Sequence, residues 1–140
     1  MPTMDIPSMA QRQFVFQGFR LTPDAAEELQ AKADGDPTDI PSGLQLLGYY
    51  HHKSIRDPAL RDSHLQLAQW VVTNYPESEA AGSPAIQIHA SRDPAGCMTM
   101  KHLWLKQVEA HSQDANLLGN AANFFLLSVG GTAEEFLLQA

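Results

Sequence analysis

The apolar positions of this chain recur mostly at intervals of three and four residues, which is the spacing of one face of an α-helix. Strict alternation of apolar and polar positions, the mark of a half-buried strand, is nearly absent. Most of the chain is therefore predicted to be helical. The two clearest stripes consist of Leu60, Leu67, Ala68 and Val71, and of Met100, Leu103, Trp104 and Val108.

Helix boundaries are marked by capping residues followed by proline. Thr22-Pro23, Asp57-Pro58 and Asp93-Pro94 each pair a side-chain oxygen that can cap a helix with a proline suited to its first position. Further helices are predicted at about 42–54, from the turn at 112–114 to Gly130-Gly131, and from Thr132 onward. The result is an all-α fold of about six helices.

The remaining segments set the domain organisation. Residues 1–21 are predicted to be an extended or mobile arm, in which Phe14, Phe16 and Phe19 nearly alternate with polar positions. Residues 22–140 are predicted to form one domain, interrupted by an irregular loop at 76–94 that is rich in proline and small polar residues.

Two glycines, Gly48 and Gly119, occupy matching places inside predicted helices. Glycine in a helix interior costs about 1 kcal/mol relative to alanine, so some compensation is expected. Close approach of two helix backbones would supply it. Both glycines are therefore predicted to lie at tight helix crossings.

The segment 103–111 resembles the second helix of a tetratricopeptide or half-a-tetratricopeptide repeat, and 112–125 resembles the turn and first helix of the next repeat. Residues 29–50, with a turn at 36–39, are similar. The resemblance implies antiparallel helical hairpins stacked as a short α-solenoid. It also implies a groove, peptide or protein partners, and no catalysis.

Asn116, Asn120 and Asn123 share one face of their predicted helix. An amide both donates and accepts hydrogen bonds, which suits it to hold the backbone of a bound peptide, and the resemblance implies that use. Tyr49 and Lys53 are expected to join these asparagines in the groove. The alternative is a solvated face on which Asn116 caps the helix.

Charge and cysteine content limit the classes of binding partner and the compartment that we expect. The formal net charge is −7, and the segment 24–39 is strongly acidic. Such a surface repels nucleic acid and anionic membranes, and it either attracts a basic protein segment or is simply solvated. The single cysteine, Cys97, fits a reducing compartment, so a cytoplasmic location is expected. Its place near a helix start would lower the thiol pKa if the residue were reactive.

No metal or cofactor is expected, because none of the six histidines stands three or four residues from another on a helix. The leading hypothesis is a protein- or peptide-binding module without catalytic activity. A second hypothesis is a small helical enzyme or ligand-binding protein with a pocket near His64, Tyr50 and Trp70. A third is a structural or self-associating fragment of a larger assembly, joined through the apolar residues 136–140.

Overall fold

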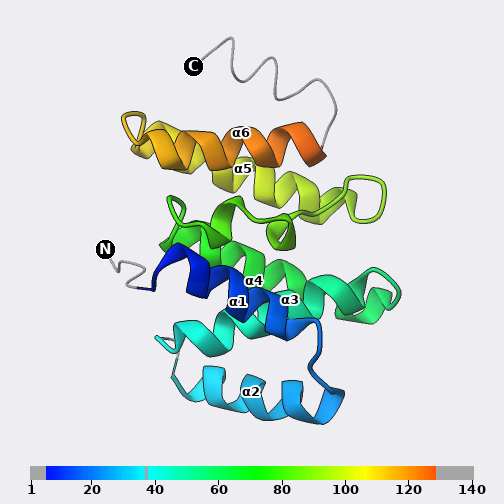
Figure 1. Ribbon diagram of the computed structural model, residues 1–140. Coiled ribbons are helices and arrows are strands. Elements are labelled where there is room, and N and C mark those ends of the chain that lie inside the picture. The colour runs from blue at the N-terminus through cyan, green and yellow to red at the C-terminus, as the bar shows by residue number, and fades with distance from the viewer. Residues whose placement is uncertain (1–5, 37, 129–140) are drawn as a thin grey trace.

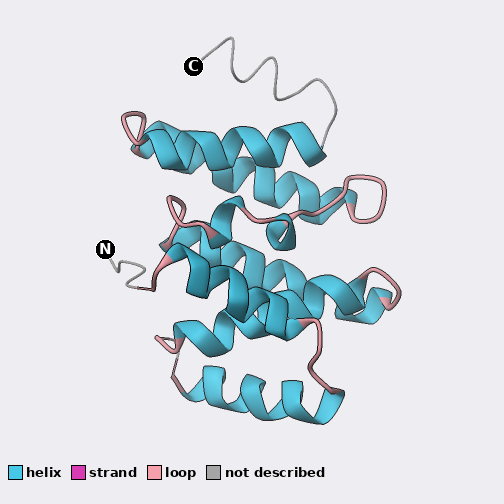
Figure 2. Ribbon diagram, in the orientation of Figure 1, coloured by secondary structure: helices cyan, strands magenta, loops and turns pink. Residues whose placement is uncertain are grey.

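The computed structural model describes residues 6–36 and 38–128, and these residues form helices and loops without strands (Figures 1 and 2). The all-α prediction is therefore confirmed over the described chain. Three single-turn 3₁₀ helices, η1 (Pro58–Leu60), η2 (Ala80–Gly82) and η3 (Pro84–Ile86), accompany the longer ones. The α-helices are α1 (Ser8–Gly18), α2 (Pro23–Gly35), α3 (Ile40–Ser54), α4 (Arg61–Asn74), α5 (Pro94–Ala110) and α6 (Ala115–Ser128).

The predicted helix starts are confirmed by their caps. The Thr22 hydroxyl accepts a hydrogen bond from the Ala25 N–H at the start of α2, and the Asp93 carboxylate accepts one from the Gly96 N–H at the start of α5. The Asp57 carboxylate caps η1, which leads directly into α4. Each bond satisfies a backbone donor that the helix itself leaves unpaired.

The helices are piled on one another, with α2 at one end of the stack and α6 at the other (Figure 1). The main core gathers between α3, α4, α5, α6 and the segment that joins α4 to α5. A smaller cluster of Ala26, Leu46 and Tyr49 attaches α2 to α3. The solenoid arrangement of a tetratricopeptide repeat stays a prediction. The predicted helix from Thr132 lies outside the described residues.

The extended arm predicted for residues 1–21 is wrong between Ser8 and Gly18, which form helix α1 on top of α3. The buried positions of α1 are Gln11, Val15 and Gly18, at helical spacing. Phe16 stays 54% exposed, so the near-alternation of phenylalanines did not mark a buried strand face. The helical spacing of apolar residues was not visible in α1, because a glutamine and a glycine occupy two of the three inward positions.

Glycines allow α1 and α3 to cross at short distance. A Cβ on Gly48 would overlap the carbonyl oxygen of Val15, and one on Gly18 would overlap the carbonyl oxygen of Gln45. The predicted role of Gly48 is therefore confirmed. The same prediction for Gly119 is wrong, because Gly119 is exposed and a Cβ there would meet nothing within 4 Å.

The predicted irregular loop at 76–94 contains η2 and η3 but is otherwise without regular structure. It is not a surface loop, because Ala81, Ile86 and Ile88 from this segment lie in the main core. Its backbone forms a 3₁₀ turn through Ile86 and becomes extended at Gln87. This buried segment forms one wall of the cavities described below.

Candidate functional site

The three predicted groove asparagines lie on α6 with different surroundings. Asn116 and Asn123 are exposed, whereas Asn120 is half-buried. The Asn120 Nδ2 donates to the carbonyl oxygens of Pro76 at 3.0 Å and Ser78 at 2.8 Å. Its amide thus holds the buried segment of its own chain. The Asp114 carboxylate accepts from the Leu117 N–H and caps α6, so the alternative role of Asn116 as the cap is wrong.

Replacing Asn120 by alanine is expected to lower the free energy of unfolding by about 2 kcal/mol, because two carbonyl groups beside the core lose their donor. The matched change Asn123→Ala removes an exposed amide from the same helix and is expected to alter stability by less than about 0.5 kcal/mol. Urea denaturation of the two variants measures the difference. Equal effects would contradict the structural role of Asn120.

The predicted groove residues on α3 do not join these asparagines. Tyr49 is 6% exposed and belongs to the cluster with Ala26 and Leu46, so its expected exposure is wrong. Lys53 is half-buried near the end of α3. Figure 1 places α6 at one end of the stack and α3 near the other, so the structure does not bring the two sets together.

His64, Tyr50 and Trp70 do not line one common pocket, because each side chain has different neighbours. The Trp70 ring covers Gly43 and meets the Tyr75 ring edge-on at 5.7 Å between centroids. The Tyr50 hydroxyl bonds to the Gln30 side chain. Among these three residues, only His64 lines the cavity that is described next.

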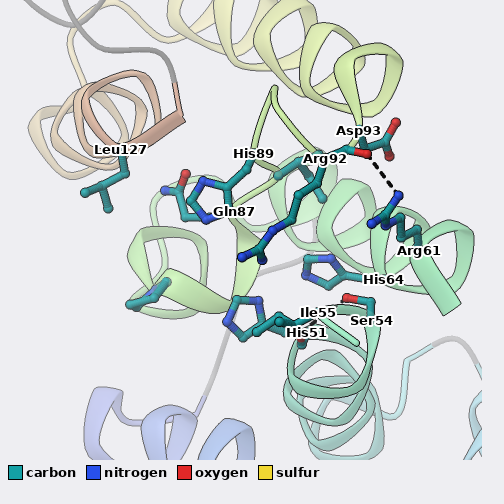
Figure 3. Close-up of a pocket in the computed structure, with 12 residues that line it drawn as sticks. His51, Ser54, Ile55, Arg61, His64, Gln87, His89, Arg92, Asp93 and Leu127 are labelled. Carbon is teal, nitrogen blue, oxygen red and sulfur yellow. Dashed lines mark hydrogen bonds between the residues drawn. The ribbon is translucent and has the colours of Figure 1, made fainter. Parts of the chain in front are cut away.

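That cavity has a volume of about 380 Å³ and is lined by the C-terminal part of α3, the start of α4, the segment from η3 to α5, and Leu127 near the end of α6 (Figure 3). Five of its lining residues carry basic side chains, and we call this cavity the basic pocket. A single acidic residue, Asp93, lines it. The basic side chains are those of His51, Arg61, His64, His89 and Arg92.

The two arginines line the pocket from different elements. Arg61 lies at the first position of α4, and its Nη1 donates to the backbone carbonyl oxygen of Arg92 at 3.0 Å. The Arg92 guanidinium extends toward His51 and His64 in Figure 3. Within the described residues neither guanidinium has a carboxylate oxygen within 4.0 Å, in contrast to Arg12, which pairs with Glu79.

His64 is the most deeply buried of the three histidines, at 4% exposed. Its Nε2 lies 2.5 Å from the Ala85 carbonyl oxygen, and because a carbonyl can only accept, Nε2 carries a proton. In neutral His64 the lone pair is therefore on Nδ1. Burial lowers the pKa of His64, and the hydrogen bond to Ala85 offsets part of that effect.

His51 has its ring centroid 5.3 Å from that of His64. Burial, together with the positive charges of His64, His52, His89 and Arg92, lowers its pKa to about 4. Both deep imidazoles are thus neutral at pH 7, while the arginines keep their charge. Burial is the main cause of the lowered pKa of His51, and the neighbouring positive charges contribute less.

The lowered pKa of His51 predicts a loss of stability in acid. An unfolded histidine takes up its proton near pH 6.5 and folded His51 only near pH 4, so its contribution is complete above pH 6.5 and is lost as the pH falls toward 4. We expect about 2–3 kcal/mol of the unfolding free energy to disappear over that range. Denaturation at a series of pH values should show a flatter profile for His51→Gln. His102→Gln, at an exposed position on α5, should keep the steep one.

The described residues do not form a nucleophile–base pair with Ser54, a reactive cysteine or a metal site. The Ser54 hydroxyl donates to the backbone carbonyl oxygen of His51 rather than to an imidazole. Cys97 is buried, and burial raises the pKa of its thiol, so the nearby helix start does not activate it. Over the described ranges, no three His, Cys, Asp or Glu side chains are placed to hold a metal ion, and no helix is long and apolar enough to cross a membrane.

Comparisons of this chain with family models, with curated proteins and with solved structures found no match. The site therefore has to be interpreted from its own geometry. Sequence reasoning had singled out His64 but missed Arg61 and Arg92, which stand far apart in the chain. The available signal was that Arg92 directly precedes the capping pair Asp93-Pro94, which fixes it at the start of α5.

Proposed function

We propose that this protein binds a small organic anion, carrying a carboxylate or phosphate group, in the basic pocket. The observation that carries the proposal is that two arginines without a carboxylate partner and three histidines line one cavity. The chain has 16 acidic against 9 basic residues, so a cavity lined by two arginines and a single acidic residue is not expected from composition.

The chemistry of the lining supports an anion over a neutral ligand. Guanidinium groups bind carboxylate and phosphate oxygens through paired, charge-assisted hydrogen bonds. The Asp93 carboxylate accepts from the Gly96 N–H as the cap of α5, and the start of that helix adds positive partial charge beside the pocket. The volume is in the range of small-molecule sites.

Binding should be linked to proton uptake. An anion placed between Arg61 and Arg92 lowers the local positive potential and raises the pKa of the neighbouring imidazoles. His64 on α4, His89 and Arg92 on the segment before α5, and His52 on α3 are the charged or titratable groups that act on His51. Affinity for the anion therefore rises as the pH falls from 7 toward 5.

This proposal corresponds to the ligand-binding form of the second sequence hypothesis. Catalysis at the same pocket lacks a paired nucleophile and base among the described residues, since the Ser54 hydroxyl is directed to a backbone carbonyl. The peptide groove on a tetratricopeptide-like solenoid and the self-associating fragment stay predictions.

Isothermal titration calorimetry with sodium phosphate and sodium acetate, at constant ionic strength set by sodium chloride, tests the proposal. We expect at least one of these anions to bind with a dissociation constant in the millimolar range, because so few atoms contribute. The affinity for the anion should be higher at pH 5.5 than at pH 7, and the heat released per injection should be larger. Absence of binding by both anions at pH 5.5 and at pH 7 would contradict the proposal.

A further inference from the structure

A second cavity, of about 240 Å³, adjoins the basic pocket. It lies between α1 and the segment from Glu79 to Ala85, and its accessible lining is almost entirely apolar. We call it the apolar groove. His51 and Pro84 line both cavities, so these two residues form the boundary between the basic pocket and the apolar groove.

The polar groups along the apolar groove are already satisfied. The Gln11 Oε1 accepts from the Ala80 N–H at 3.0 Å, and its Nε2 donates to the Ile6 carbonyl oxygen at 2.7 Å. Arg12 and Glu79, which both line the groove, form an ion pair with each other. The surface that a ligand can contact in the apolar groove is therefore apolar.

The groove runs along one face of α1. Its lining residues Arg12, Val15, Phe16 and Phe19 follow one another at helical spacing, with Arg12 toward the start of the helix. Phe19, at the other end, has its ring centroid 6.4 Å from that of His51. The groove thus has the Arg12–Glu79 ion pair toward one end and the His51 side of the basic pocket at the other.

The aromatic side chains of this groove are more exposed than packing requires. Phe16 is 54% and Phe19 36% exposed, and neither belongs to the main core. Large apolar side chains gathered around a hollow commonly mark a binding surface. A positive pocket joined to an apolar groove is complementary to a molecule with one anionic end and one hydrocarbon end.

Building on the proposed function, we infer that the ligand is an amphiphilic monocarboxylate, such as a medium-chain alkanoic acid. Its carboxylate lies between Arg61 and Arg92, and its hydrocarbon chain passes His51 and Pro84 into the apolar groove along Phe16. A second anionic group at the far end is not accommodated, because Arg12 is neutralised there by Glu79.

Calorimetric titrations with acetate, hexanoate, octanoate and decanoate, below their micellar concentrations and at constant ionic strength, test this inference. Each methylene that enters the groove should raise the affinity about three- to fourfold until the groove is filled. Decanol, which has the chain without the charge, should bind at least tenfold more weakly than decanoate. Equal affinity of decanol and decanoate would overturn the inference, and the role of the arginines with it.

Variants separate the groove from the basic pocket. Phe16→Ala should weaken decanoate about tenfold and leave acetate unchanged, and Phe16→Leu should restore most of the loss. Leu105→Ala removes a similarly exposed side chain from α5 and should change neither ligand. If all four carboxylates bind with equal affinity and Phe16→Ala has no effect, the chain-binding inference fails while the anion proposal stands. If no carboxylate binds but phosphate does, the chain-binding inference fails and the anion proposal stands; if neither carboxylates nor phosphate bind, both fail.

Discussion

Replacing Gly48 by alanine is expected to lower the free energy of unfolding by about 3 kcal/mol. The new Cβ would overlap the carbonyl oxygen of Val15 in α1. Backbone atoms cannot rotate away as a side chain can, so α1 has to shift from α3. Urea denaturation followed by far-ultraviolet circular dichroism measures the change.

Gly119→Ala is the matched control, because it makes the same substitution inside a helix where a Cβ meets nothing within 4 Å. It should stabilise the protein by about 0.5–1 kcal/mol, the gain in helix propensity and in chain stiffness. The two identical substitutions are therefore expected to act with opposite signs. A stabilising Gly48→Ala would contradict the close crossing of α1 and α3.

The double variant Arg61→Gln, Arg92→Gln is expected to weaken binding of octanoate or phosphate about a hundredfold. Each lost charge-assisted hydrogen bond is worth about 1.5–3 kcal/mol, and non-additivity keeps the total below the sum. Both side chains line the pocket without a carboxylate partner in the described structure, so their neutralisation should cost little stability. Calorimetry gives the affinity, and a denaturation curve verifies the fold.

Arg56→Gln serves as the control for this pair. Arg56 is exposed just beyond the end of α3, near the basic pocket but outside its lining. Its neutralisation changes the net charge by one unit and should reduce affinity by less than about threefold through long-range electrostatics alone. A loss as large as that of the pocket variant would show that overall charge, rather than the two pocket arginines, determines binding.

The sequence predicted the helices best where caps and proline coincide. At Thr22-Pro23 and Asp93-Pro94, the capping oxygen and the proline mark the helix start within two residues, and the structure places both caps as expected. Helix α1 has no such signal, since Pro7 precedes it without a side-chain cap. Helix α1 is stabilised by packing against α3 through Gly18 and Gly48. Such a contact between distant residues cannot be predicted from the local sequence pattern.

The candidate site was less predictable for the same reason. Arg61, Arg92 and His51 belong to three different elements, and only the path of the buried segment between α4 and α5 brings them together. Tyr49 and Tyr50 are adjacent, so periodicity alone did not decide which of them turns inward. Asn120 was found by its helical spacing, but the partner it bonds is the backbone at 76–78, which no sequence pattern identified.

The most direct test of anion binding in the basic pocket is the titration of His51 by nuclear magnetic resonance, with and without octanoate. Without ligand, the imidazole should titrate near pH 4. With saturating octanoate its pKa should rise by at least about one unit, because a carboxylate between Arg61 and Arg92 offsets the positive charge beside it. An unchanged titration of His51 at a ligand concentration that saturates binding would contradict the account.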